Sequence, residues 1–496
     1  MPDELLELIK AGDFGDVINE LRNGRIQVSP ATVVNASQYD PKLHDINDKT
    51  KRPDKMVVVD KDSDEYGEVK TINPNVEMTT ETGFRIEKVA RIALALQKLI
   101  VKRAVAFTFG NPPTYTSDAE DATEQDVLKA IIKVFADVKE RTINRRVARS
   151  VFSTQEVAEY WYPVEQKEEH VIYGFPTKYK FKCAIFSPAN GDTLWPYFDD
   201  NRDLVAFSRE FTKKDNDLQT RNYFETWTAD EHYLWTCQGA HGKDNANWEL
   251  VEGYPKKITI GKIPIIYSSQ PQVEWADVQS LIDRLEKLLS NFADTNDYHA
   301  SPKIFVQGAV KGFARKGEAG AIIEGEEGAT AQYLSWASAP ESVKLEIETL
   351  LRMIYAITQT PDISFDAVKG IGAVSGVALR LLFMDPHLKV QDKREIFDEH
   401  LQRRANIVKA YVGEANIKWR DAAASLIVQP QLTPYMIEDE LNKINILTAA
   451  NGGKQIASQA ETIRRLGWTD DAKKELEEIQ AEEDHANSFE EGEPTY

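Results

Sequence analysis

Helical periodicity is the dominant pattern of hydrophobic residues in this chain. Apolar residues recur every three or four positions in several long segments, which predicts amphipathic helices. These segments are residues 84–108, 123–148, 275–299, 339–359, 376–412 and 433–484. The clearest stripe belongs to 275–299, with Val278, Leu281, Ile282, Leu285, Leu288, Leu289 and Phe292. Pro386 interrupts the fifth segment, and we expect a kink there.

Between residues 150 and 268 the hydrophobic period changes from 3.6 to 2. The runs are rich in aromatic and β-branched residues and are separated by turn clusters such as SPANGDT and HGKDNAN. This pattern predicts an antiparallel meander. The dense aromatic residues could stack on bases, but few Lys or Arg lie among them, so packing within the sheet is favoured.

The remaining segments are less regular. Residues 301–338 carry many glycines between short apolar runs, which predicts a small β-rich excursion with tight turns. Residues 1–80 are expected to be loosely organised. The last fifteen residues hold six acids and no Lys or Arg, so we expect disorder there. Together the patterns predict an α+β protein.

The charge of the chain limits the kinds of partner it can bind tightly. The formal net charge is −20, which argues against tight nucleic-acid binding but not against a surface along which DNA slides. Cys183 and Cys237 lie in no Cys/His cluster and are expected to be reduced. The best candidate membrane run, 92–109, is interrupted by three basic residues.

The sequence shows no convincing active site, and we predict neither a catalytic residue, a cofactor nor a metal site. Nucleotide-binding, zinc-protease and serine-hydrolase motifs are missing from the sequence. Residues 370–376 read G-x-G-x-x-x-G, one residue longer than the dinucleotide fingerprint, and they follow a helix rather than a strand. The acidic run 60–68 lacks the Gly and Glu positions of a calcium loop.

Four segments together resemble the portal proteins of long-tailed bacteriophages. The first runs from GKIPIIYSSQPQVEWADVQ to NDYHASPKIFV (261–306), and the second is LSWASAPESVKLEIETLLRMIYAITQTPDIS (334–364). SGVALRLLF (375–383) and FTFGNPPTY (107–115) complete the set. The resemblance covers residues 255–412 well and 84–115 moderately.

This resemblance implies a portal-type ring subunit with an α/β wing, a two-helix stem, a clip and a crown. It places the wing at 1–270, stem helices at 271–300 and 339–359, the clip at 301–338 and a tunnel loop at 360–375. A long kinked wing helix would occupy 376–425, and the crown with an acidic disordered tail 426–496.

The resemblance also suggests which residues carry the function. The tunnel loop would present Asp362, Asp366, Lys369, Gly370, Gly372 and Ser375 to the channel. The clip would make contacts through Lys303, Lys311, Arg315 and Lys316, although these residues could equally serve only to solubilise turns. The stem stripe residues Leu281, Leu285, Leu288 and Ile354 are expected to be buried between subunits, because one partner helix cannot cover the stripe fully.

The implied function is a DNA channel at one capsid vertex, used for genome packaging, head-tail joining and DNA ejection. The expected partners are a homo-oligomeric ring, usually of twelve subunits, non-specifically bound double-stranded DNA and the terminase packaging motor. A head-completion or adaptor protein and the major capsid and scaffolding proteins are expected too, but no membrane. The expected location is the portal vertex of the virion, after assembly in the host cytoplasm. The alternative is another connector or capsid shell component without a DNA-gating role.

Overall fold

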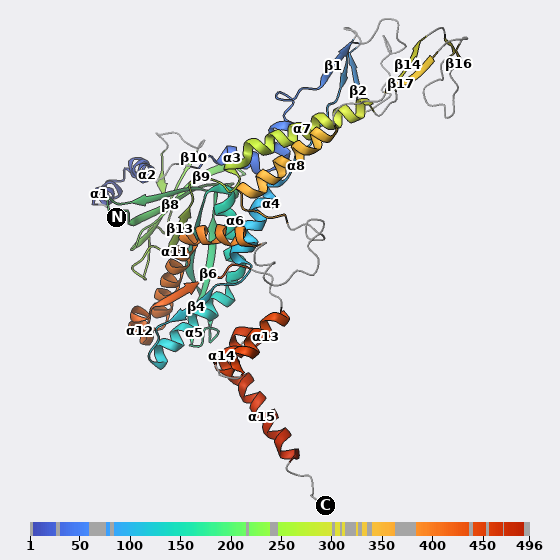
Figure 1. Ribbon diagram of the computed structural model, residues 1–496. Coiled ribbons are helices and arrows are strands. Elements are labelled where there is room, and N and C mark those ends of the chain that lie inside the picture. Colours follow the sequence, from blue (N-terminus) through green and yellow to red (C-terminus); the bar gives the residue numbers. More distant parts are fainter. Residues whose placement is uncertain are drawn as a thin grey trace, which may run out of the picture. The chain divides into compact units, whose positions relative to one another are not determined.

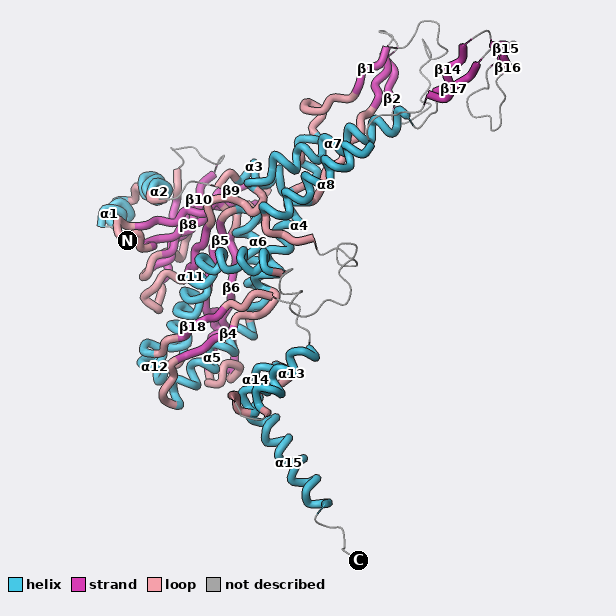
Figure 2. The backbone as a smooth tube through the Cα atoms, in the orientation of Figure 1, coloured by secondary structure: helices cyan, strands magenta, loops and turns pink. Residues whose placement is uncertain are grey.

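The chain folds into two compact units. In the computed structural model the described residues are 3–25, 30–58, 76–79, 84–214, 218–238, 247–299, 303–307, 310–312, 324–325, 330–334, 340–362, 383–435, 440–452, 456–469 and 471–490. The first unit comprises residues 1–360 and 388–434, and the second comprises 361–387 and 435–496. The first unit contains both helices and antiparallel strands, largely in separate runs along the chain (Figures 1 and 2), which confirms the predicted α+β class.

Two N-terminal helices contribute to the core of the first unit. Helices α1 (Asp3–Ala11) and α2 (Phe14–Asn23) bury Leu5 and Ile18 against Phe224 and Trp235 of the large sheet. The expectation of a loosely organised N-terminus is therefore wrong for this segment. Helix α3 (Thr32–Tyr39) follows, and strands β1 (Lys55–Val58), β3 (Phe84–Glu87) and β2 (Val76–Thr79) form a small antiparallel sheet in that order.

The predicted meander is present as two antiparallel sheets. The larger has the order β11-β10-β9-β8-β7, with β12 (Lys256–Lys257) also pairing with β10. Its strands are β7 (Thr193–Phe198), β8 (Leu204–Lys214), β9 (Thr220–Trp227), β10 (Glu231–Gln238) and β11 (Glu249–Leu250). The smaller has the order β13 (Ile265–Ser269), β5 (Glu156–His170) and β6 (Thr177–Phe186). Trp227 is fully buried against the rings of Tyr160 and Phe186, so it packs within the protein rather than being available to bases.

The helix predicted over 123–148 is two helices. Helix α5 (Ala122–Asp137) ends before Lys139, which has a left-handed backbone (φ 60°), and α6 (Glu140–Thr154) begins directly after it. A left-handed residue cannot continue an α-helix, so the chain changes direction there. The basic side chains of residues 141–150 lie on the solvated face of α6, whereas Ile143 and Val147 of the same helix are buried.

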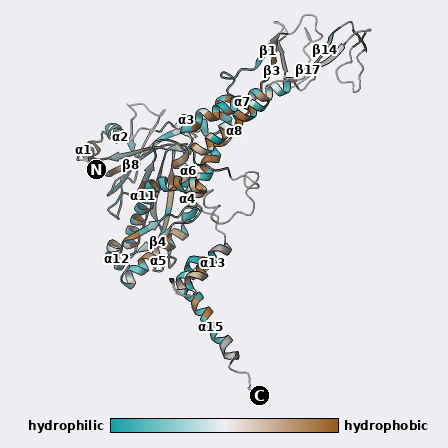
Figure 3. Cartoon of the chain, viewed as in Figure 1, coloured by the Kyte–Doolittle hydropathy of each residue, from teal (hydrophilic) through white to brown (hydrophobic). Residues whose placement is uncertain are grey.

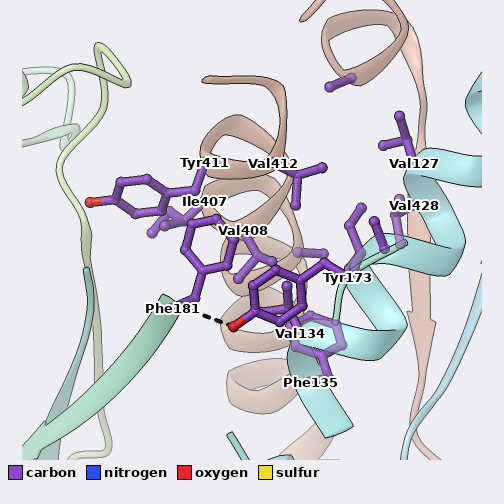
Figure 4. Packing of buried hydrophobic residues seen from close by; sticks show 14 of the residues in the cluster. Val127, Val134, Phe135, Tyr173, Phe181, Ile407, Val408, Tyr411, Val412 and Val428 are labelled. Atoms are coloured by element: carbon purple, nitrogen blue, oxygen red, sulfur yellow. Dashed lines mark hydrogen bonds between the residues drawn. The ribbon is translucent and has the colours of Figure 1, made fainter. Parts of the chain in front are cut away.

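Helix α11 (Met384–Ala415) returns from the far end of the sequence to complete the main core. Figure 4 shows Val408 and Val412 of α11 on the side of Val134 and Phe135 of α5, whereas the Tyr411 ring extends to the other side of α11. The Tyr411 hydroxyl donates a hydrogen bond of 3.1 Å to a backbone carbonyl of β5, at Trp161. A long helix within the predicted range 376–425 thus packs back onto the N-terminal helices, over residues 384–415.

The same helix also carries a buried polar cluster that joins it to α6 and β5. Arg404 is fully buried and forms two hydrogen bonds with the carboxylate of Glu159, of 2.7 and 2.6 Å. It reaches Glu140 of α6 at 3.0 Å, and His400 lies 3.1 Å from Glu159. Burial favours the neutral carboxyl, but Arg404 outweighs it and holds the pKa of Glu159 well below its usual range.

Pro386 lies in the first turn of α11 as described, not in its interior. A proline there forfeits no intrahelical hydrogen bond, so it requires no kink within residues 384–415. Residues 376–382 lie outside the described residues, and the kink predicted on that side stays untested.

Helices α7 (Gln279–His299) and α8 (Pro340–Ile357) confirm the two helices predicted around the glycine-rich excursion. Between them the described residues form two short antiparallel pairs (Figure 1). Strand β14 (Lys303–Gln307) pairs with β17 (Thr330–Leu334), and β15 (Val310–Gly312) pairs with β16 (Glu324–Gly325).

The boundary of the C-terminal unit lies later than predicted. Helix α12 (Arg420–Ser425) is followed by β18 (Val428–Gln431), which pairs with β4 (Thr114–Ser117), so residues 426–434 belong to the first unit. The second unit contains α13 (Glu440–Asn451), α14 (Gln459–Leu466) and α15 (Ala472–Glu490). The acidic tail is helical up to Glu490, so the disorder predicted from 482 is wrong for residues 482–490. Within the described residues, no helix combines the length and apolar composition that a membrane span needs.

Candidate functional site: the α7–α8 pair and the anchored ends of segment 361–387

Helices α7 and α8 lie side by side (Figure 1) and share a narrow apolar seam. Leu285 of α7 and Ile354 of α8 are 1% and 0% exposed in the single chain. At the edge of the seam, Arg284 of α7 donates a hydrogen bond of 2.8 Å to Glu346 of α8. The prediction that Leu285 and Ile354 are buried between subunits is therefore wrong, because each is already covered by its own chain.

The apolar surface left on the helix pair is elsewhere. Leu281 and Leu288 of α7 are partly exposed. On α8, Leu345, Met353 and Ile357 are 62%, 48% and 52% exposed, and Figure 3 shows hydrophobic positions along this helix. These three side chains lie along one side of α8, because they are spaced by eight and four residues. That side borders the buried Ile354, which is three residues before Ile357. We name them the outer stripe.

The polar face of α7 is covered by an extended segment, residues 88–95, that was predicted to be helical. Backbone N–H groups of Ala90, Ile92 and Leu94 donate hydrogen bonds of 2.7, 2.9 and 2.7 Å. Their acceptors are the side chains of Asp294, Ser290 and Glu286, respectively. Helix α4 (Leu96–Phe109) begins only after this segment.

The spacing of these N–H groups along the segment matches the spacing of their acceptors along α7, which explains why the segment is extended. Two residues of extended chain advance by about 6.6 Å and four residues of helix by about 6 Å, so alternate N–H groups meet every fourth side chain of α7. The apolar residues of 88–95 resemble a helical pattern in sequence. The acceptors that satisfy their backbone lie about 200 residues further along the chain.

His44 fastens the N-terminal part of the chain to the same helix. Its Nδ1 lies 2.7 Å from Oε1 of Glu286 and its Nε2 lies 2.7 Å from the carbonyl oxygen of Gln38. A carboxylate and a carbonyl can only accept, so both ring nitrogens donate and the ring is an imidazolium. Burial lowers the pKa of His44, but Glu286 outweighs it, and the pKa is raised above its ordinary value of 6.5. In the sequence His44 showed no obvious partner.

Segment 361–387 begins and ends at two points that are held together. Thr358 directly follows α8, and Lys389 lies in α11. The ammonium group of Lys389 donates a hydrogen bond of 3.0 Å to the carbonyl oxygen of Thr358 and forms an ion pair of 2.6 Å with Glu274. The other carboxylate oxygen of Glu274 lies 2.9 Å from the Lys393 ammonium.

This anchor is a buried ion pair. Lys389 is 9% exposed, and burial lowers its pKa although Glu274 opposes the shift. Burial alone would raise the pKa of Glu274, but Lys389 and Lys393 outweigh it and the pKa is lowered. The arrangement fixes the end of α8 to α11 and so holds both ends of segment 361–387 in place.

Helix α8 ends at Ile357, shortly before Thr360 and Pro361. Gln359 has a left-handed backbone (φ 50°), and the buried Thr360 donates its N–H to the carbonyl of Tyr355 at 2.9 Å. Of the predicted tunnel-loop residues, the structure places only Asp362, which is exposed. The others lie outside the described residues: Asp366, Lys369, Gly370, Gly372 and Ser375.

The predicted clip residues are placed in part. Lys303 begins β14 opposite Leu334, and Lys311 lies in β15, whereas Arg315 and Lys316 lie outside the described residues. Cys183 and Cys237 are free cysteines, as expected. The described residues contain no group of three or more His, Cys, Asp or Glu side chains arranged to hold a metal ion.

Comparison with known families shows to which family the chain belongs. The model of the family described as "Phage portal protein, SPP1 Gp6-like" matches residues 85–488, most of the chain. The chain belongs to the phage portal protein family. Membership assigns it the general role of a portal, the connector between the head and the tail of a phage particle.

Solved structures with a related chain include parts of gene transfer agent (GTA) particles. One, described as the neck of an empty GTA particle computed with C6 symmetry, is 14% identical, covers 75% of this chain and 89% of its own, and has a TM-score of 0.39. A second, from the virion of a native GTA particle, is 12% identical over 75% of this chain and 89% of its own, with a TM-score of 0.37. No curated protein matches the chain.

Proposed function

We propose that this portal protein assembles into a ring of twelve subunits at one capsid vertex and that DNA is packaged and ejected through the ring's central channel. The match of residues 85–488 to the portal family carries this proposal. The ring holds duplex DNA without sequence preference, receives it from a terminase motor and passes it to a head-completion or adaptor protein. Capsid and scaffolding proteins surround the ring at the virion vertex.

The surfaces of the helix pair support a ring contact through the stem. One face of α7 is covered by residues 88–95 and another by α8, so both are unavailable to a neighbour. The outer stripe of α8 remains exposed in the single chain. Burying each of its side chains against a neighbouring α7, near Leu281 and Leu288, stabilises the ring by about 1–2 kcal/mol per side chain.

Residues 360–375, which include the first half of segment 361–387, act as the tunnel loop, which we also call the channel loop. Glycines at 370 and 372 let its backbone change conformation around moving DNA, and Lys369 touches phosphates transiently among the nearby acids. The buried anchor of Lys389 and Glu274 supports this role, because a loop that meets a moving polymer needs ends that do not move with it.

The clip end contacts an acidic partner surface or the emerging DNA through Arg315 and Lys316. Charge reversal at both positions is expected to impair packaging while leaving the ring intact. Unchanged packaging at both low and high salt would show that these residues only keep the turn soluble.

Electron micrographs of the purified protein test the proposal directly. The expected result is a closed ring with a central hole about as wide as duplex DNA. A second measurement, packaging of DNA by particles that carry the protein, separates a DNA channel from a connector without a gating role. Particles that lack a ring, or rings whose removal leaves packaging unchanged, would contradict the proposal.

A further inference from the structure

A cavity of about 540 Å³ lies between α11, α12 and residues 259–262. Its walls are small residues, Ala410, Gly413 and Ala423, with Gly261 at the loop side. Gly413 lets the two helices approach closely, since a Cβ there would lie 3.1 Å from that of Ala423. The volume falls within the range of protein sites that bind small ligands or peptide side chains.

The charged groups of this cavity are mostly cationic. Lys262, Lys409 and Arg420 line it together with a single carboxylate, Glu414. This local excess of positive charge lies in a chain whose net charge is −20. The position is therefore an exception to the acidity of the chain as a whole.

The cationic groups are held in place and only partly neutralised. The ammonium group of Lys409 donates a hydrogen bond of 2.6 Å to the carbonyl of Leu426, and Arg420 lies 2.8 Å from Glu414. Lys262 has no hydrogen-bond or ion-pair partner among the residues that the structure describes. Burial and the nearby Lys262 ammonium lower the pKa of Lys409, so the two amines repel each other across the cavity.

We propose that this cavity binds an acidic peptide segment of a partner protein, with one carboxylate placed among Lys262, Lys409 and Arg420. A carboxylate there accepts charge-assisted hydrogen bonds and relieves the repulsion between the two amines. The small apolar walls accommodate the methylene groups of a glutamate side chain. This site contains no residue of the helix pair or of segment 361–387, and the proposal is independent of the channel proposal.

The shape of the site favours a peptide over DNA. Duplex DNA is a convex rod that is bound through many phosphates along an extended basic surface. Here three cations surround one concave site, which admits a protruding side chain but not a duplex. The apolar walls would also be left unused by a free inorganic anion.

Fluorescence anisotropy on the full chain tests the proposal, with a fluorescein-labelled hexaglutamate peptide as the probe. Lys262→Glu is expected to weaken binding about tenfold or more, because a charge-assisted contact is lost and repulsion is added. Lys418→Glu, an equal charge change at an exposed residue outside the cavity lining, is the matched control and should change binding less than twofold. Ala424→Trp, which narrows the cavity without changing any charge, should also weaken binding.

Three outcomes would overturn the proposal. Equal binding by the parent and Lys262→Glu would show that the peptide does not bind in this cavity. Displacement of the peptide by inorganic phosphate or by a short DNA duplex at equal concentration would assign the site to phosphate groups. Binding by dispersed subunits that is lost in assembled rings would assign it to a neighbouring copy. Normal rings of Lys262→Glu in micrographs would separate any of these results from a failure of ring assembly.

Discussion

The ammonium group of Lys389 donates a hydrogen bond to the carbonyl oxygen of Thr358, 3.0 Å away, across 31 residues of sequence. One bond thus joins the last turn of α8 to the first turns of α11, and the intervening chain begins and ends beside it. Glu274, which precedes α7, completes the anchor from a third part of the chain. The end of α8, the start of α11 and the residues before α7 are therefore connected through one buried ion pair.

Removing this ammonium group should destabilise the protein locally. Lys389→Met removes one of two donors to the Thr358 carbonyl, the other being the Thr360 hydroxyl, and leaves Glu274 with Lys393 alone. We expect a loss of about 3 kcal/mol in the free energy of unfolding, because a buried charge loses its closest partner. Limited proteolysis within 361–387 should also become faster. Urea denaturation measures the free energy of unfolding. Lys344→Met, at an exposed position of α8, is the control and should change stability by less than about 0.5 kcal/mol. Equal stability of the two variants would contradict the anchor.

The outer stripe and the inner seam of the helix pair should respond differently to a carboxylate. Met353→Asp is expected to leave the subunit folded and to prevent ring formation, since Met353 is 48% exposed in the single chain. Leu285→Asp is expected to unfold the helix pair, because a carboxylate buried without a partner costs several kcal/mol. Circular dichroism reports the fold and light scattering the ring.

Lys344→Asp places the same carboxylate on another side of α8 and serves as the control. Intact rings for Met353→Asp would exclude the outer stripe from the subunit contact. Loss of rings in the control as well would show that any added charge on α8 is sufficient.

The contact of His44 with Glu286 makes stability depend on pH. The folded-state pKa of His44 lies above its ordinary value of 6.5. The stabilisation is therefore fully present below about pH 6.5 and is lost as the pH rises through the folded-state pKa. Urea denaturation between pH 6 and 9 should show this decrease, and His44→Gln should remove it. A parent protein whose His44-dependent stability rises with pH over this range would contradict an imidazolium at this position.

The glycines of the channel loop should matter for translocation and little for stability. Gly370→Pro/Gly372→Pro stiffens the loop and removes two N–H groups, so DNA translocation should slow or stall while rings form normally. Lys369→Ala should have a milder effect, because one exposed charge contributes little in physiological salt. The measurement is the length of DNA packaged per particle. Full-length packaging by the double variant would show that these glycines form turns and have no role in translocation.

The sequence by itself determined the elements whose signal is local. The stripes of 275–299 and 339–359 and the alternating pattern of 150–268 each reflect which side chains one helix or strand must bury, and these elements are present in the structure. Pro361, three residues after Thr358, is also a local signal that the helix cannot continue, since proline restricts the residue before it.

Tertiary structure alone decided which residues pair with each backbone N–H group and which residues cover each apolar or charged side chain. Residues 88–95 have a helical pattern, but their N–H groups are satisfied by α7 side chains, and the extended form results. Leu285 and Leu288 belong to the same predicted stripe, yet Leu285 is buried by its own chain and Leu288 is partly exposed, because a stripe shows the apolar side of a helix and not what covers it. The imidazolium of His44 and the anchor at Lys389 likewise depend on residues hundreds or tens of positions away, which no local pattern encodes.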